Sequence, residues 1–437
     1  MQTRAPQNRL AILAIFLMAC LPPQLAWSAS SESDQAIAQS QHKIRRNPNY
    51  PLAYFQLGDA YIQKARESGD NTYFDLAEQS LKKSLSLNPE QGGARRHLAY
   101  VMALRHDFAA AAAEAERAIA INPNDVDAYA VLGDAYLETG RFEQAERTYK
   151  VMMNLKESLS SYSRLSGLKS LKGDTDGAIT DLKKAIELGR QDNQPKESIA
   201  WAEWQLASDY FSQGNLAEAE NHLQRALGTY ANYYRALAGL AQVRAAQQRY
   251  EDAMGLYQRA VAIVPVPEYI AALGDLYTKL NRPDEARKQY DLVEYIGKLS
   301  ALNQGLYNRE LAYFYADHDF KSAEGLRLAE RELEYRQDIY AYDVLAWNLF
   351  RNGKIVEARA AIDQALRLGT KDAKLFYHGG MIYAHLGEKD RARDYFQRAL
   401  STNPDFHLLF ADNARRMLRE IENSGAHVVA NQLSEER

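Results

Sequence analysis

Side chains that could act as nucleophiles, bases or metal ligands are scattered along this sequence of 437 residues. His378 and His385 are seven residues apart and can share a helix face, but no third ligand follows at a fixed spacing, and a protein zinc site uses three or four ligands. Ser-x-x-Lys strings such as Ser80 with Lys83 and Ser166 with Lys169 match the string of a serine nucleophile and its lysine base. Both occur in amphipathic runs, where Ser and Lys are ordinary solvent-facing residues.

The remaining motifs of catalysis are missing from the sequence. It has no His-Glu-x-x-His string and no glycine-rich loop that would cradle a phosphate. Its single cysteine, Cys20, lies in an apolar stretch near the N-terminus. The residues therefore predict no catalytic site, no metal and no cofactor, and a protein that is not an enzyme.

The elements that would carry any site are copies of one unit, whose clearest form is Val126–Glu157. Two amphipathic runs flank the polar break at Thr139–Arg141, and small residues such as Gly133 and Ala145 recur at fixed places in them. Apolar residues at helical spacing predict two helices, and a small residue at their crossing lets them pack closely. One such pair cannot bury its apolar side alone, so it needs copies on either side.

Ten units can be aligned to this one, and most neighbours begin 33 or 34 residues apart. Asn-Pro pairs such as Asn88-Pro89 and Asn122-Pro123 end several units, as expected where proline cannot continue a helix. Inserted residues follow Arg66 in the first unit and Arg190 in the fourth. The units begin at about Pro51, Gly92, Val126, Leu159, Ala200, Tyr234, Pro267, Gly305, Ile339 and Ala373.

The pattern of Gly133, Tyr136, Ala145 and Pro123 resembles that of the tetratricopeptide repeat family, over roughly residues 51–404. The resemblance implies an all-α fold, a right-handed solenoid of about ten helix-turn-helix repeats. A helix in residues 29–50 would be a partial repeat before the array at 51–404. Residues 405–422 would form a capping helix, as terminal repeats require. Asn423-Ser424-Gly425 would end it, and residues 423–437 would be a disordered tail.

The N-terminal segment has the three parts of a secretory signal peptide. Arg4 and Arg9 precede an apolar stretch, and Ala26-Trp27-Ser28 offers small residues for cleavage. Residues 1–28 would then be removed, and the mature chain would be exported by a bacterium to the periplasm. The alternative is lipidation, because Leu17-Met18-Ala19-Cys20 resembles a lipoprotein box. Cys20 would then anchor an outer-membrane lipoprotein.

Charge and hydropathy exclude some classes of partner. A formal net charge of −4 offers no excess of basic residues for nucleic acid, so we expect no nucleic-acid partner. No stretch after residue 30 reaches the roughly 20 apolar residues that a membrane-spanning helix needs. Membrane association is expected only through a lipid anchor, and no residue pattern points to an oligomeric state.

In the family that the sequence resembles, the first helices of successive units line a concave groove that binds a partner. Transferring these inward positions, and favouring the residue types that dominate binding hot spots, gives eleven candidates. Asp134 and Glu138 would add an acidic patch facing the groove. The candidates are Arg96, Tyr100, Trp201, Trp204, Arg235, Arg309, Tyr313, Asp343, Trp347, Arg351 and Tyr377.

These expectations favour a non-enzymatic scaffold of the cell envelope that binds a protein or peptide partner in the groove. An alternative is a polysaccharide-binding or secretion-accessory repeat protein of the periplasm or outer membrane, for which stacked Trp and Tyr rings would serve. A reaction carried out on the repeats themselves is a third class, and no residue pattern supports it.

Overall fold

The computed structural model describes residues 31–302 and 308–435, and in that part of the chain every regular element is an α-helix. The signal segment with Cys20, and the predicted start of the eighth unit at Gly305, lie outside the described residues. None of the described helices is both long and apolar enough to cross a membrane.

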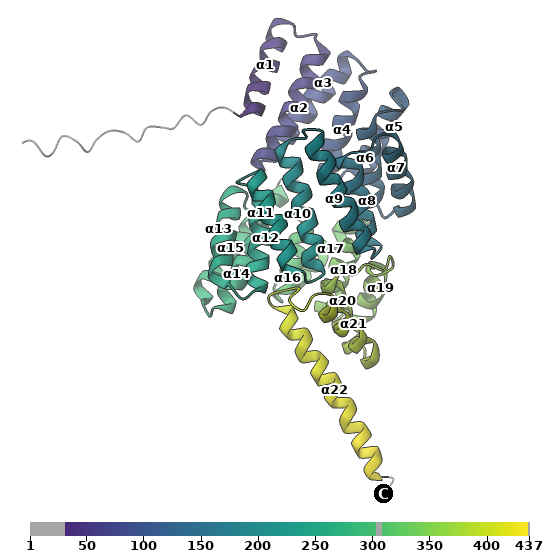
Figure 1. Cartoon of the computed structure of the whole chain (residues 1–437), viewed down its shortest axis with the longest axis vertical. Coiled ribbons are helices and arrows are strands. Elements are labelled where there is room, and N and C mark those ends of the chain that lie inside the picture. Colours follow the sequence, from purple (N-terminus) through teal and green to yellow (C-terminus); the bar gives the residue numbers. More distant parts are fainter. Residues whose placement is uncertain (1–30, 303–307, 436–437) are drawn as a thin grey trace, which may run out of the picture.

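The helices follow one another as antiparallel pairs, each pair packing on the next (Figure 1). The N-terminal half contains α1 Glu32–Arg46, α2 Pro51–Ser68, α3 Thr72–Leu87, α4 Gly92–Leu104, α5 Phe108–Ile121, α6 Val126–Glu138, α7 Phe142–Leu155, α8 Leu159–Leu171, α9 Thr175–Gln191, α10 Lys196–Ser212 and α11 Leu216–Thr229. The C-terminal half contains α12 Tyr234–Ala246, α13 Tyr250–Ile263, α14 Pro267–Lys279, α15 Pro283–Leu302, α16 Asn308–Asp317, α17 Ser322–Tyr335, α18 Ile339–Arg351, α19 Ile355–Ala365, α20 Ala373–His385, α21 Lys389–Thr402 and α22 Phe410–Glu435.

The pairs from α2/α3 to α20/α21 are ten helix-turn-helix units, so the predicted all-helical solenoid of about ten repeats is confirmed. Eight of the ten predicted first residues, among them Pro51, Val126 and Ala373, are also the first residues of helices. The inserted residues lengthen helices instead of forming long loops. They extend α2 to Ser68 and α9 to Gln191, and α10 begins four residues before Ala200.

Close helix crossings explain the small residues of the pattern. A Cβ atom placed on Gly133 would lie 2.3 Å from Cε1 of Tyr149, and one on Gly274 would lie 2.4 Å from Cε1 of Tyr290. Glycine at these crossings therefore lets a tyrosine ring of the second helix pack directly on the backbone of the first. The rings then fill the space between neighbouring units, where interiors are packed as densely as organic crystals.

The last helix differs from its predicted extent. The sequence predicts that α22 ends at Asn423-Ser424-Gly425, with a disordered tail beyond, but the helix continues to Glu435. A single glycine costs a helix only about 1 kcal/mol relative to alanine, and no proline follows to break it. Figure 1 shows α22 projecting away from the body of the solenoid.

The solenoid also contacts itself between repeats that are distant in the sequence. The backbone N–H of Gln337 donates to the carbonyl of Glu138 at 2.8 Å, and Arg336 forms an ion pair with the Glu138 carboxylate at 2.6 Å. Further along, the side-chain amide of Asn403 donates to the carbonyl of Phe211 at 2.7 Å, across 192 positions of sequence. These contacts join repeats that are distant in the sequence, and each links a loop to the C-terminal part of a first helix.

Candidate binding site

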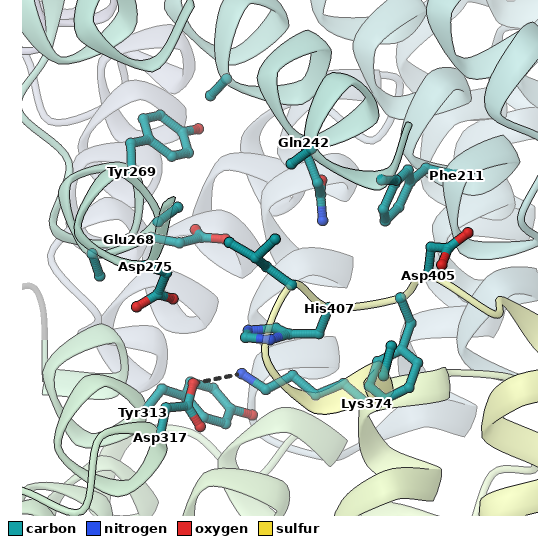
Figure 2. Close-up of a pocket in the computed structure, with 18 of the residues that line it drawn as sticks. Phe211, Gln242, Glu268, Tyr269, Asp275, Tyr313, Asp317, Lys374, Asp405 and His407 are labelled. Carbon is teal, nitrogen blue, oxygen red and sulfur yellow. Dashed lines mark hydrogen bonds and ion pairs between the residues drawn. The ribbon is translucent and has the colours of Figure 1, made fainter. Parts of the chain in front are cut away.

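A cavity of about 900 Å³ lies on the inner side of the C-terminal six repeats. Its walls come from α10, α12, α14, α16 and α18, the first helices of successive units, and from the start of α20. The segment 403–409, between α21 and α22, crosses the same space and contributes Asp405 and His407 (Figure 2). Repeat geometry therefore brings together side chains that are up to about 200 residues apart.

The cavity wall carries many charged groups. Its Lys and Arg residues are Arg235, Lys279, Arg309, Lys374 and Arg415, and its carboxylates are Glu268, Asp275, Glu310, Asp317, Asp343, Asp372, Asp405 and Asp412.

Lys374, the second residue of α20, is a cation on the cavity wall. Its ammonium group lies 3.1 Å from Asp317 and 4.2 Å from the centre of the Tyr313 ring, and Figure 2 shows the ion pair beside His407. Burial opposes the charged form of Lys374, but Asp317 and Asp343 outweigh that effect and raise its pKa. Burial, together with the nearby Lys374 charge, lowers the pKa of His407 to about 4.

A second polar group on the wall is built around Asp275 of α14. Its Oδ1 accepts from Tyr290 at 2.8 Å and lies 2.7 Å from Nε2 of His318. Burial opposes protonation of His318, but the hydrogen bond and the charge of Asp275 outweigh it and raise the His318 pKa. This pair joins α14 to the end of α16.

Five of the predicted contact residues line the cavity, namely Trp204, Arg235, Arg309, Tyr313 and Asp343. The Arg235 guanidinium lies 5.2 Å from the Trp204 ring centre and 5.3 Å from that of Tyr234. Arg309 is held by Glu332 at 3.0 Å and Asp338 at 2.7 Å. The hydroxyl of Tyr313 donates to Asp343 at 2.7 Å. Asp343 itself is fully buried and pairs with His378, so the prediction that it contacts a partner directly is not supported.

The other predicted residues lie apart from the cavity lining. Arg96 forms ion pairs with Asp125 and Asp127 of the next unit. Tyr100 and Trp201 are half-buried and pack on core clusters. Arg351 lies 5.1 Å from the Trp347 ring centre, and its Nε donates to the carbonyl of Ala316.

Trp347 and Tyr377 are core residues in the structure, each only 1% exposed. Their burial does not support the prediction that they contact a partner directly. Their bulk fills the gap between α18, α20 and α22. The indole N–H of Trp347 donates to Asp317 at 2.8 Å, and its ring stacks on His378 at 4.2 Å. Although Trp347 occupies an inward position of its repeat, its side chain packs in the interface with the neighbouring units.

The predicted acidic patch is also corrected, because basic residues neutralise both of its members. Arg164 binds Asp134 at 2.8 Å, and Arg336 binds Glu138 at 2.6 Å. Among the described carboxylates that line the cavity, Glu268 and Glu310 form no ion pair, and Asp372 accepts only from the backbone N–H groups of Lys374 and Leu375.

Sequence reasoning missed Glu268, Glu310, Asp317, Lys374 and His407, all of which line the cavity. A usable signal existed for three of them, since Asp317 occupies the thirteenth position of its unit, as the predicted residue Arg351 does. Glu268 and Lys374 occupy the second position of their units, the same register as the predicted residue Arg235. His407 follows Asn403-Pro404 in a segment that the repeat pattern does not describe.

Among the described residues, no group of three or more His, Cys, Asp or Glu side chains could hold a metal ion.

Comparison with known proteins identifies the class. Models of the tetratricopeptide repeat family match residues 62–126, 102–165, 157–232, 205–266 and 344–405. Together these matches cover more than half of the chain, which therefore belongs to the tetratricopeptide repeat family. Proteins of this family generally mediate protein–protein interactions, and the chain is assigned to that general class.

Individual relatives are distant. The chain is 24% identical over 267 residues to the human protein IFIT1 homolog B, a match covering 58% of this chain and 50% of the human protein. The chain thus spans about half the length of the curated relative it matches. Yeast Tom70 is similar in structure, with 15% identity, 92% of this chain and 96% of that chain covered, and a TM-score of 0.38. The human IFIT1 dimer with PPP-AAAA is 15% identical, and the match covers 77% of this chain and 78% of the IFIT1 chain, with a TM-score of 0.49. A tetratricopeptide repeat protein from Parabacteroides merdae is 21% identical, and the match covers 60% of this chain and 98% of that protein, with a TM-score of 0.35.

Proposed function

We propose that this protein is a non-enzymatic scaffold of the bacterial cell envelope, which binds a protein or peptide partner inside its solenoid. The observation that carries the proposal is the inner cavity of about 900 Å³. Its size falls within the range of roughly 300–1,000 Å³ typical of ligand pockets. A space of that size on the inner face accepts a short peptide segment of a partner, not a folded domain.

The cell-envelope setting rests on the N-terminal sequence pattern. A basic front, an apolar stretch and a small-residue cleavage site are typical of a secreted bacterial precursor. Cleavage near Ser28 gives a periplasmic protein, and lipidation of Cys20 gives a membrane-anchored one. Mass spectrometry of the mature N-terminus distinguishes these two forms.

A peptide partner fits the cavity better than a polysaccharide. Sugars stack on open aromatic faces, but the guanidinium of Arg235 covers a face of Trp204, and the ammonium of Lys374 covers a face of Tyr313. Those cations already use the aromatic faces that a sugar ring would need.

Site-specific photo-crosslinking tests the proposal. A photoreactive phenylalanine replaces Gln242, which is exposed to the cavity, or Val356, which is 72% exposed on α19 and does not line it. Illumination in the producing bacterium is expected to yield one defined protein adduct from position 242 and none of the same mass from position 356. Equal adducts from both positions, or none from position 242, would exclude the cavity as the binding site.

A further inference from the structure

We infer that the segment that occupies the inner cavity is a basic peptide, whose Lys or Arg side chains meet the carboxylates of Glu268 and Glu310. This inference rests on the proposed function, because it names the chemistry of the partner at the same site. It is carried by the charge balance of the cavity and by which of its charges are already paired within the protein.

Most of the cavity's cations are neutralised. Lys374 is paired with Asp317, Lys279 with Asp412 at 3.0 Å, and Arg415 with Asp405 at 3.0 Å. Arg309 has two carboxylates, Glu332 and Asp338. These residues therefore offer little attraction to an acidic ligand, since each would first have to leave its partner.

Glu268 and Glu310 differ from these residues because they have no ion-pair partner in the part of the chain that the structure describes. Both line the cavity, and neither forms an ion pair with another described residue. Glu268 is exposed to the cavity, and Figure 2 shows its carboxylate pointing into the space beside His407. Burial within the solenoid raises the pKa of both carboxyl groups, and Lys374 and Arg235 only partly offset this for Glu268. A cationic ligand would supply the ion-pair partner that these two carboxylates lack within the described part of the protein.

Arg235 is the one Lys or Arg of the lining that forms no ion pair with a described carboxylate. Its guanidinium instead lies over the rings of Trp204 and Tyr234. Asp372 of the lining also forms no ion pair with a described residue, but it accepts hydrogen bonds from the backbone N–H groups of Lys374 and Leu375. Arg235 can balance at most one of Glu268 and Glu310. Eight carboxylates against five Lys or Arg side chains leave the lining acidic, and complementary charge guides both encounter and specificity.

The direct test measures peptide binding to the mature full-length protein. The probes are two fluorescein-labelled decapeptides, one alternating Gly with Lys and the other alternating Gly with Glu, followed by fluorescence anisotropy. The wild type is expected to bind the lysine peptide and to bind the glutamate peptide at least tenfold more weakly. The double variant Glu268→Gln with Glu310→Gln should bind the lysine peptide at least tenfold more weakly than the wild type does.

A matched control separates the cavity from the overall charge. Glu330 and Glu357 are exposed residues that do not line the cavity, and changing both to Gln removes the same two charges. This control should bind the lysine peptide as the wild type does. Equal losses in both double variants, tighter binding of the glutamate peptide, or no binding of the lysine peptide to the wild type would overturn the inference.

The two proposals fail in distinguishable ways. If position 242 crosslinks to a partner but the cavity double variant retains full affinity for that partner and for the lysine peptide, the cavity binds a partner whose chemistry is not basic. If position 242 yields no adduct, the proposed function itself fails. Circular dichroism of each variant checks that the helical array is intact.

Discussion

At the scale of single residues, glycines at helix crossings set how closely the two helices of a unit approach. Gly133 is the clearest case, because the Tyr149 ring occupies the place of a side chain. Glycine is otherwise a poor helix residue, so its presence at a crossing has to be offset by this close packing. The hydroxyl of Tyr149 also donates to Asp134 at 2.8 Å, which ties the same ring to the inner face.

Replacing Gly133 with Ala should lower the free energy of unfolding by about 1–3 kcal/mol, the usual cost of overpacking a core. Gly255, within α13, is the matched control because a Cβ atom there would have no neighbour within 4 Å. Gly255→Ala should raise stability by up to about 1 kcal/mol through helix propensity. Thermal unfolding followed by circular dichroism measures both, and destabilisation of similar size in the two variants would contradict the crossing argument.

The His318–Asp275 pair predicts a pH dependence of stability. The folded-state pKa of His318 is raised, so its contribution is complete below the unfolded pKa of about 6.5 and is lost as pH rises through the folded value. His318→Gln should therefore lower the melting temperature by about 2–4 °C at pH 6 and by less at pH 9. Melting curves at the two pH values check this, and a larger gap at pH 9 would be the wrong sign.

The inner-face residues show where sequence reasoning succeeds and where it stops. Register alone placed Trp204, Arg235 and Tyr313 on the cavity wall, because the helix period fixes which side chains point inward. It could not tell that Trp347, in an equivalent inward position, is buried. That depends on how α20 and α22 pack over it, and on Asp317 being in reach of its indole.

At the scale of elements, α18 joins the cavity to the C-terminal core. Trp347 of this helix hydrogen-bonds Asp317 of α16, and Asp317 in turn binds Lys374 of α20. Three first helices of successive units are thus linked through one carboxylate. The same carboxylate holds Lys374 in place on the cavity wall.

Trp347→Phe should cost about 1–3 kcal/mol, because it keeps most of the ring packing but leaves the buried Asp317 without one donor. Trp201→Phe is the matched control, since its half-buried indole forms no hydrogen bond with a described residue. The control should change stability by less than half as much. Chemical denaturation of both variants measures the difference, and equal losses would remove the role assigned to Asp317.

Helix boundaries were largely predictable, because proline, asparagine and the repeat period mark them in the sequence. The differences occur where the chain departs from the repeat. Inserted residues could equally have formed a loop, but α2 continues to Ser68, where Glu67 accepts a hydrogen bond from Ser33 of α1. Asn423-Ser424-Gly425 predicts a helix end, but a lone glycine does not stop α22, which continues to Glu435.

At the scale of the whole molecule, contacts between distant repeats join parts of the solenoid that lie far apart in the sequence. Arg336 and Gln337 bind Glu138, Asn403 binds Phe211, and Lys279 binds Asp412. Nothing in a single repeat encodes these contacts. They depend on small rotations accumulated from one unit to the next, which is why the sequence pattern of a unit does not predict them.

Arg336→Ala should loosen this contact and enlarge the molecule. The change removes an ion pair to Glu138 and the contact of the guanidinium with the Phe108 ring. Small-angle X-ray scattering should show a larger radius of gyration. Arg331→Ala, at an exposed position on α17, the helix that ends just before Arg336, should leave it unchanged. An unchanged radius in both variants would mean that this contact does not hold the repeats together.

The central claim, that the partner binds inside the solenoid, is tested most directly by filling the cavity. Gln242→Trp places a large side chain in the cavity, and Val356→Trp places the same side chain on α19 outside it. The measurement is the affinity of each folded variant for the partner identified by crosslinking at position 242. The account predicts at least tenfold weaker binding for Gln242→Trp and wild-type affinity for Val356→Trp. Full affinity for the filled variant would contradict it.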